Sequence, residues 1–525
     1  MLLGIVLHGD MSFIPGMGVI WGVQDSQSNP LYGVLSASIH GWRMPLFFLV
    51  SGSFTAMLWK KRGLRALLVH RFKRIFLPMV LAMLTIIPVM LTVASYVRSQ
   101  PAPESTVTAM DGNADAQELA RQRGVPDIDL SVAVLMGDLD SLGAYLQSGG
   151  DVDAKNAQGA APLHVACLFG RADAAELLLD ANASLEVKNN EGATPEQLLT
   201  LDWGTTEYIA KLVQVPVDRE QLLNGRRRIA QAIEDRTGRS VSIQTTGDGQ
   251  DAGLNGLIAL FFYVPVFHHL WFLWFLCWFV CGFVVIAKLL QTLRVPAVSN
   301  KWLASWLRYV WLIPLAAVPQ YFMASSQYAY GPDTSVGLLP LPAVFAYYAI
   351  FFGYGVMYFG ANDQAVAVGK GYWWKLAVAV LIVFPIGLSL QGPNEIGGRI
   401  LFSVMQVSYA WVMSFGMMGL FDRLFRSQRF WVRYLSDSSY WLYLAHIPLV
   451  VLLQFFVSGW SLPSVLKFGF VCSVATGLLL VSYQIGVRNT WLGALLNGRR
   501  YPGREQDRPT PEPTYQVPNR HAPAG

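Results

Sequence analysis

Residues 39–97 decide the fold. They read IHGWRMPLFFLVSGSFTAMLW (39–59), KKRGLRALLVHRFKR (60–74) and IFLPMVLAMLTIIPVMLTVASYV (75–97). The first and third stretches are apolar and long enough to cross a bilayer as helices, which takes about 20 residues. The middle stretch carries seven Lys or Arg and no acid. Because short loops rich in Lys and Arg stay in the cytoplasm, the sequence predicts two transmembrane helices joined by a cytoplasmic connection.

Other apolar stretches of similar length predict seven more spans, at 270–290, 303–323, 338–360, 373–390, 396–420, 439–458 and 462–487. The run Met1–Leu7 is apolar but too short to span, and 254–267 is also short, so an interfacial or re-entrant piece is expected there. We therefore expect an all-α, polytopic helical membrane protein with about ten transmembrane helices, the first of them apparently truncated.

The short loops give a consistent orientation. Loops 324–337 and 391–395 contain no Lys or Arg and are expected outside. Arg294, Lys370, Arg423 and the tail then fall inside. The same alternation puts residues 9–38 outside, so a first span should precede them and the chain should begin late. The alternative is an external N-terminus with nine spans. We expect a multi-pass protein of the cell (inner) membrane with a cytoplasmic, disordered tail after Tyr501.

An acidic, water-soluble block interrupts this pattern. Between Arg98 and Asp251 there are 24 acidic and 13 basic residues, whereas the rest of the chain has 10 acidic and 26 basic residues. The predicted domains are therefore a membrane part at 1–97, an insert with linkers at 98–253, a second membrane part at 254–500 and a tail at 501–525. The alternation of spans places the insert outside the cytoplasm.

The insert repeats with a period of 33 residues. Gly137 recurs as Gly170, and DVDAK (151–155) recurs as SLEVK (184–188). The unit GAAPLHVACLFGRADAAELLLDANASLEVKNNEG (159–192) resembles an ankyrin repeat, and the repeats should cover about 128–215. His164 is expected to have a structural role in its turn. The run Arg226–Arg228 is expected to be a solvated helix face. Ankyrin repeats imply a protein partner.

Several classes of function are not indicated. The four cysteines are too few for a disulfide framework. The basic residues lie beside apolar segments, where membrane topology accounts for them, so we expect no nucleic-acid partner. Adjacent histidines on a helix diverge, so we expect no metal at His268 and His269.

Ionisable groups within spans are costly and indicate function. They gather toward the outer half of the predicted bundle, at His8, Asp10, His40, Arg43, His269, Glu395, Arg399 and His446. Arg71 and Arg74 lie on the cytoplasmic side. A site at mid-depth would therefore meet one substrate from each side of the membrane.

These residues resemble a family. The runs HGWRMPLFFLVSG (40–52), RFKRIFLP (71–78), HLWFL (269–273) and YWLYLAHIP (440–448) resemble, in order, segments of the acyltransferase-3 family of membrane proteins. The closing VRNTWLG (487–493) is similar to its glucan-modifying branch. The resemblance implies an O-acyltransferase that moves an acetyl- or succinyl-class group from cytoplasmic acyl-CoA, a co-substrate rather than a bound cofactor, to a hydroxyl of an extracytoplasmic glycan or lipid-linked sugar.

The expected roles follow. His8 would be the general base or a transient acyl carrier. Arg71 and Arg74 would bind the phosphates of CoA. Acceptor binding or support falls to a larger set: Asp10, His40, Arg43, Ser51, His269, Glu395, Arg399, Tyr443 and His446. Ser51 and Gly52 also suit close helix packing. In the family an Arg precedes the first-span His by eleven residues; in this chain that position would fall before Met1.

Two other functions remain open from the sequence. Ten spans with polar groups at mid-depth also describe a transporter or exporter of a glycan or acylated metabolite, although the halves show no duplication of hydropathy. The other alternative is a catalytically inactive scaffold in which the ankyrin repeats are the functional part.

Overall fold

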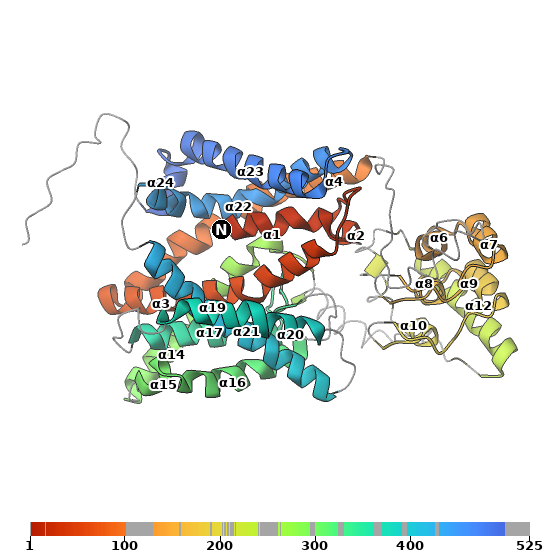
Figure 1. Cartoon of the computed structure of the whole chain (residues 1–525), viewed down its shortest axis with the longest axis horizontal. Coiled ribbons are helices and arrows are strands. Elements are labelled where there is room, and N and C mark those ends of the chain that lie inside the picture. The colour runs from red at the N-terminus through yellow and green to blue at the C-terminus, as the bar shows by residue number, and fades with distance from the viewer. Residues whose placement is uncertain are drawn as a thin grey trace, which may run out of the picture.

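The chain folds into a bundle of apolar helices and a separate group of short repeat helices (Figure 1). The computed structural model describes residues 2–498, without 16, 101–129, 157–158, 190–191, 202, 204–205, 207–208, 211–214, 216, 240, 242–260, 263, 295–299, 324–329, 361–368, 391–395 and 426–429. All regular elements of this described part are helical, so the predicted all-α class is confirmed. The predicted tail and the flank before the repeats lie outside the described residues.

Each predicted span coincides with a helix. These are α3 (Leu31–Arg71), α4 (Leu77–Ser99), α14 (Trp271–Thr292), α16 (Leu307–Met323), α17 (Pro342–Gly360), the run α19–η4–α20 (Tyr372–Val378, Ala379–Val383, Phe384–Ser389), α21 (Ile396–Leu424), α22 (Phe430–Ser458) and α23 with η5 (Ser464–Ser482, Tyr483–Val487). Large apolar side chains such as Leu84, Leu381 and Ile485 are more than 70% exposed, as expected of helices that face lipid.

By length and composition, seven helical stretches of the described residues suit a membrane span. One of them, Leu31–Val97, has 67 residues and contains both α3 and α4, while α16 has only 17 residues. The predicted connection 60–74 is not a loop, because α3 continues through it and the π-helical turn η2 (Phe72–Phe76) leads into α4. Gly63, with φ of 78°, breaks the α-helical path there.

The bundle has two distinct ends (Figure 1). We call the "repeat end" the one that holds η1 (Met11–Phe13), α2 (Gly18–Trp21) and the end of α20, and beyond which the repeat helices lie. We call the "α24 end" the opposite one, with α15 (Asn300–Ala304) and α24 (Trp491–Asn497). The helix α1 (Leu2–Asp10) packs against α3, α22 and α23 and points toward the repeat end. Residues 261–262 and 264–267 lie beside the segment that leads into α17, because the Phe267 N–H donates to the Val336 oxygen and the Leu339 N–H donates to the Phe261 oxygen.

Glycines bring α3 and α17 into direct backbone contact. A Cβ on Gly52 would lie 2.0 Å from the Phe352 oxygen, and a Cβ on Gly355 would lie 1.9 Å from the Leu49 oxygen. The Ser53 hydroxyl donates to the Gly355 oxygen at 2.9 Å. This is the small-residue packing used between membrane helices, and it fixes the central helix α3 within the bundle.

The repeat helices are α6 (Leu130–Met136), α7 (Leu139–Gln147), α8 (Pro162–Phe169), α9 (Ala172–Asp180) and α10 (Pro195–Leu199). They share a core that includes Leu142, Leu163, Leu178 and Leu199. His164 has the expected structural role. Its Nδ1 accepts from the Ala161 N–H at 3.1 Å, and its Nε2 lies 3.0 Å from the Ala193 oxygen in the next unit.

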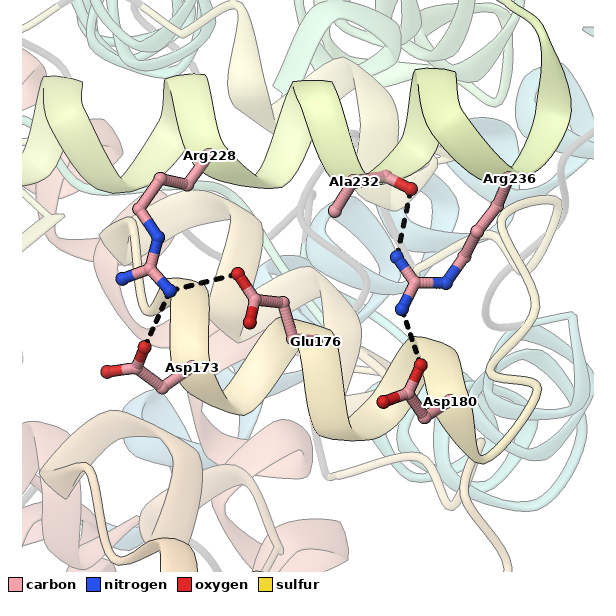
Figure 2. Close-up of polar contacts among 6 residues, drawn as sticks. All are labelled: Asp173, Glu176, Asp180, Arg228, Ala232 and Arg236. Atoms are coloured by element: carbon pink, nitrogen blue, oxygen red, sulfur yellow. Dashed lines mark hydrogen bonds and ion pairs between the residues drawn. The ribbon is translucent and has the colours of Figure 1, made fainter.

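A longer helix, α12 (Arg219–Thr237), covers the end of the repeat stack. Figure 2 shows Arg228 bridging Asp173 and Glu176 of α9, and Arg236 reaching Asp180. The prediction of a solvated face for Arg226–Arg228 is wrong for Arg226, which is 1% exposed. Its guanidinium donates to the Cys167, Leu168 and Leu201 oxygens. Carbonyls at helix ends need a hydrogen-bond donor. Hydropathy does not reveal this need, so it could not indicate that Arg226 is buried.

We expect Gly52→Ala to destabilise the bundle by about 1–3 kcal/mol, the usual cost of overpacking a tight contact. The measurement is the melting temperature of the detergent-solubilised protein, followed by size-exclusion chromatography after heating. Gly282→Ala is the matched control, because a Cβ at Gly282 in α14 meets nothing within 4 Å. Equal melting temperatures for Gly52→Ala and the wild-type protein would contradict the packing account.

We expect the amide protection factors of residues 159–199, corrected for the intrinsic pH dependence of exchange, to be lower below pH 6.5 than above it. Burial lowers the pKa of His164 from its ordinary value of 6.5. The contribution of the neutral ring to the stability of the repeats is therefore fully present above pH 6.5. It is lost as the pH falls toward the lowered pKa, because the protonated ring cannot accept the hydrogen bond from the Ala161 N–H. Hydrogen exchange with mass spectrometry on the whole protein measures this. If His164→Gln shows the same pH dependence, His164 is not its source.

Candidate functional site

Three imidazole rings from different parts of the chain meet near the repeat end. His8 lies on the last turn of α1, His446 lies within α22 and His269 lies in the short turn η3 (His268–Leu270). The His8 and His446 ring centroids are 5.1 Å apart, and those of His446 and His269 are 5.9 Å apart. The structure thus brings together three of the histidines that the sequence singled out.

Arg43 of α3 joins this group through Gly4 of α1. The Arg43 Nη1 donates to the Leu3 oxygen at 3.4 Å. A Cβ on Gly4 would lie 3.2 Å from that Nη1 and 3.9 Å from His446 Nε2. Gly4 is four residues before His8 and therefore on the same helix face. The missing side chain at Gly4 is what lets the guanidinium and the His446 ring approach α1.

Several polar atoms in this group are buried and have no hydrogen-bond partner in the part of the chain that the structure describes. They are His8 Nδ1, Arg43 Nε, His269 Nδ1, His446 Nε2 and both carboxylate oxygens of Asp10. Most buried polar groups in proteins are paired, and exceptions call for a ligand, water or catalytic role. We call His8, Arg43, His269 and His446 the "imidazole cluster". Its free nitrogens suit a polar substrate.

Hydrogen bonds to the main chain set the histidine tautomers. His446 Nδ1 lies 2.8 Å from the Tyr443 oxygen, and His269 Nε2 lies 3.0 Å from the Leu444 oxygen. A carbonyl only accepts, so these nitrogens carry the protons. His446 Nε2 and His269 Nδ1 are then lone-pair acceptors when the rings are neutral. Tyr443, a predicted site residue, donates its hydroxyl to the His269 oxygen at 2.6 Å and so supports the cluster from behind.

Two residues that sequence analysis missed hold His8 in place. The Gln454 side-chain amide donates to the His8 oxygen at 3.0 Å and to the Gly9 oxygen at 2.9 Å. The Trp21 indole N–H donates to Gln454 Oε1 at 2.7 Å, and its ring stacks on His8 at 5.5 Å and 2°. Gln454 lies eight residues after His446, two turns along one face of α22. This spacing is the feature of the sequence that could have indicated Gln454.

Other predicted residues have their contacts outside the imidazole cluster, although His40 lies near enough to interact electrostatically with His8 and Arg43. His40 Nε2 bonds the Pro332 oxygen at 3.0 Å. Arg399 stacks on the Tyr321 ring at 4.8 Å. Ser51 is about two turns from Arg43 along α3, and its oxygen accepts from the Thr55 hydroxyl at 2.8 Å. Glu395 lies outside the described residues.

Asp10 is close to the cluster but does not orient His8, because its buried carboxylate oxygens accept no hydrogen bond. The i, i+2 spacing on α1 points the two side chains in different directions. The segment that follows α1 is fixed by another acid. Asp25 forms a buried ion pair with Lys467 of α23 at 2.6 Å, which ties the chain around α2 to the bundle.

Arg71 and Arg74 lie toward the α24 end. Arg71 Nη2 donates to the Thr55 hydroxyl at 3.0 Å, while its Nε is buried without a partner. Arg74, in the π-helical turn η2, donates to the Ala494 and Leu495 oxygens of α24. Thr55 is twelve residues beyond Arg43 on α3, or about 18 Å along a helix. The guanidinium of Arg71 is therefore well separated from the imidazole cluster.

Two family models match the chain. A family model described as an acyltransferase domain, that of the acyltransferase-3 family, matches residues 1–111 and 241–484. A model described as ankyrin repeats matches residues 130–179. No curated protein and no solved structure matches the chain.

Proposed function

The chain belongs to the acyltransferase-3 family, and from this premise we propose that it is a membrane O-acyltransferase whose chemistry takes place at the imidazole cluster. The family match favours acyl transfer over the carrier considered from the sequence. The observation that carries the proposal is the set of buried nitrogens on His8, Arg43, His269 and His446 that have no hydrogen-bond partner among the described residues.

In this mechanism His8 is the general base. It takes the proton of the acceptor hydroxyl, whose oxygen attacks the thioester carbonyl. The oxyanion that forms is stabilised by the Arg43 guanidinium, and His446 Nε2 and His269 Nδ1 accept hydrogen bonds from the acceptor. When the C–S bond breaks, the proton passes from His8 to the sulfur of CoA. The ester, free CoA and neutral imidazole remain. Gln454 and Trp21 position His8 throughout.

The donor in this proposal is acyl-CoA, with its phosphates at Arg71 and Arg74. Two arguments support this. Guanidinium groups bind phosphate in a bidentate way, and the buried Arg71 Nε has no hydrogen-bond partner among the residues described. The flexible thiol arm of CoA then has to cover the roughly 18 Å along α3 between Thr55 and Arg43. The transferred group is of the acetyl or succinyl class.

The acceptor in this proposal is an extracytoplasmic glycan or lipid-linked sugar, as in the glucan-modifying branch. The protein lies in the cytoplasmic membrane, with the repeat end outside and the α24 end inside. This assignment is supported by the basic stretch 60–74. The ankyrin repeats recruit a protein partner on the outer side. An inactive scaffold is the alternative, and the next experiment separates the two.

We expect His8→Ala to lower acyl transfer by about 10²–10⁴-fold, the usual contribution of a general base. Acyl-CoA consumption in proteoliposomes and mass spectrometry of envelope glycans measure the effect. His268→Asn is the control, since His268 has φ of 43° and Asn tolerates that conformation. Wild-type activity in His8→Ala would exclude His8 as the base, and no activity in the wild-type protein would favour the scaffold.

We expect Arg71→Gln to raise the KM for acyl-CoA by roughly tenfold or more, with a smaller change in kcat, because a charge-assisted phosphate contact is worth about 1.5–3 kcal/mol. Arg74→Gln should also lower the melting temperature, since Arg74 bonds the carbonyls of α24. Arg65→Gln is the matched control, an exposed residue of the same basic stretch. An unchanged KM in Arg71→Gln would place the donor elsewhere.

A further inference from the structure

A polar pocket lies at the α24 end, away from the imidazole cluster. It has a volume of about 300 Å³ and is bounded by the turn 369–371, the start of α19 and the last turns of α21. Its polar side chains are Lys370, Tyr372, Asp422 and Arg423. None of the residues predicted for acyl transfer lines it.

Glycines build this pocket. A Cβ on Gly369 would lie 2.5 Å from the Gly419 Cα, and a Cβ on Gly419 would lie 2.3 Å from the Gly369 oxygen. Gly371 has φ of 65°, and a Cβ there would lie 2.2 Å from the Trp374 indole nitrogen. The turn before α19 therefore rests directly on α21. This close approach brings Lys370 of the turn beside Asp422 and Arg423 of α21.

The pocket lining holds two basic side chains and one acid, and two buried cations, Lys375 and Arg308, lie near Lys370 and near each other. Lys370 and Arg423 are exposed, whereas Lys375 and Arg308 are 3% and 4% exposed. Lys375 donates to the Lys370 oxygen. Arg308 stacks on the Phe415 ring of α21 at 4.7 Å, and its Nε is buried without a partner. Asp422 is the only acid that lines the described pocket, so an anionic ligand is favoured.

Exposed apolar side chains follow the lining residues in sequence on α19 and flank Asp422 and Arg423 on α21. Trp373 is 69% exposed and Trp374 45% exposed on α19, while Phe421, Leu424 and Phe425 at the end of α21 are 42%, 58% and 46% exposed. Trp side chains gather where a membrane meets water. A ligand in this pocket therefore has its phosphate among cations and its remaining part against apolar side chains, which is the layout of a phospholipid.

We propose that this pocket binds the headgroup of an anionic glycerophospholipid that carries free hydroxyls, of the phosphatidylglycerol type. Lys370 and Arg423 hold the lipid phosphate, and Lys375 and Arg308 add to the positive electrostatic potential at the phosphate. Asp422 accepts a hydrogen bond from a headgroup hydroxyl. The acyl chains lie along Trp373 and Phe421. A carboxylate in an otherwise basic pocket disfavours bare phosphate and selects a headgroup with donors.

Native mass spectrometry of the delipidated, full-length protein tests this with phosphatidylglycerol and phosphatidylcholine as probes. The wild-type protein should retain phosphatidylglycerol in preference. Lys370→Gln with Arg423→Gln should weaken that binding by about tenfold or more, as expected for loss of two charge-assisted contacts. The control is Lys288→Gln, an exposed lysine near the same end. If the double variant does not fold, Arg423→Gln alone is measured in the same way.

Two further measurements test whether the bound phosphate belongs to a lipid and which lipid headgroup the pocket prefers. Excess inorganic phosphate or CoA should not displace the lipid, and displacement by either would overturn the lipid assignment in favour of a free phosphate. Asp422→Asn should shift the preference from phosphatidylglycerol toward phosphatidic acid, and an unchanged preference would overturn the role of Asp422. Retention of phosphatidylglycerol by the double variant at the wild-type level would overturn the site. None of these outcomes depends on acyl transfer.

Discussion

Polar atoms inside a bundle of apolar helices have few partners, and this constraint shapes the end of α1. The His8 and Gly9 carbonyls find theirs in the side chain of Gln454, whose oxygen in turn accepts from Trp21. An unpaired carbonyl in such a setting costs several kcal/mol. Gln454 therefore fixes the last turn of α1, and with it the position of His8 against Arg43 and His446. The buried pair of Asp25 and Lys467 holds the segment that carries Trp21.

The positions of the other functional residues are related to this last turn of α1 through the helix α3. α3 runs along the bundle past both groups of functional residues, with Arg43 beside α1 and Thr55 beside Arg71. Close packing on α17 through Gly52 and Gly355 keeps α3 in register with its neighbours. The single helix α3 thus sets the distance between the proposed donor residues and the proposed acceptor residues. The repeat helices lie beyond the repeat end of the bundle (Figure 1).

The spans and the repeats could be predicted because both are periodic or continuous in the sequence. An apolar run such as 75–97 identifies α4, and the recurrence of Gly137 as Gly170 identifies the repeats. The site was only partly predictable. His8, Arg43, His269 and His446 stood out as costly groups within spans, but Trp21 and Gln454 are 433 residues apart. No local pattern predicts that contact, and none distinguishes His40 or Arg399, which bond elsewhere, from the clustered residues.

The most direct measurement is an electron cryomicroscopy structure of the His8→Ala protein with acyl-CoA and a glucan acceptor. The account predicts a sugar hydroxyl within hydrogen-bond distance of His446 Nε2, and the thioester carbonyl oxygen within hydrogen-bond distance of Arg43. Density for the acceptor at the α24 end would contradict the account. So would an imidazole cluster whose nitrogens bond only protein atoms and no substrate.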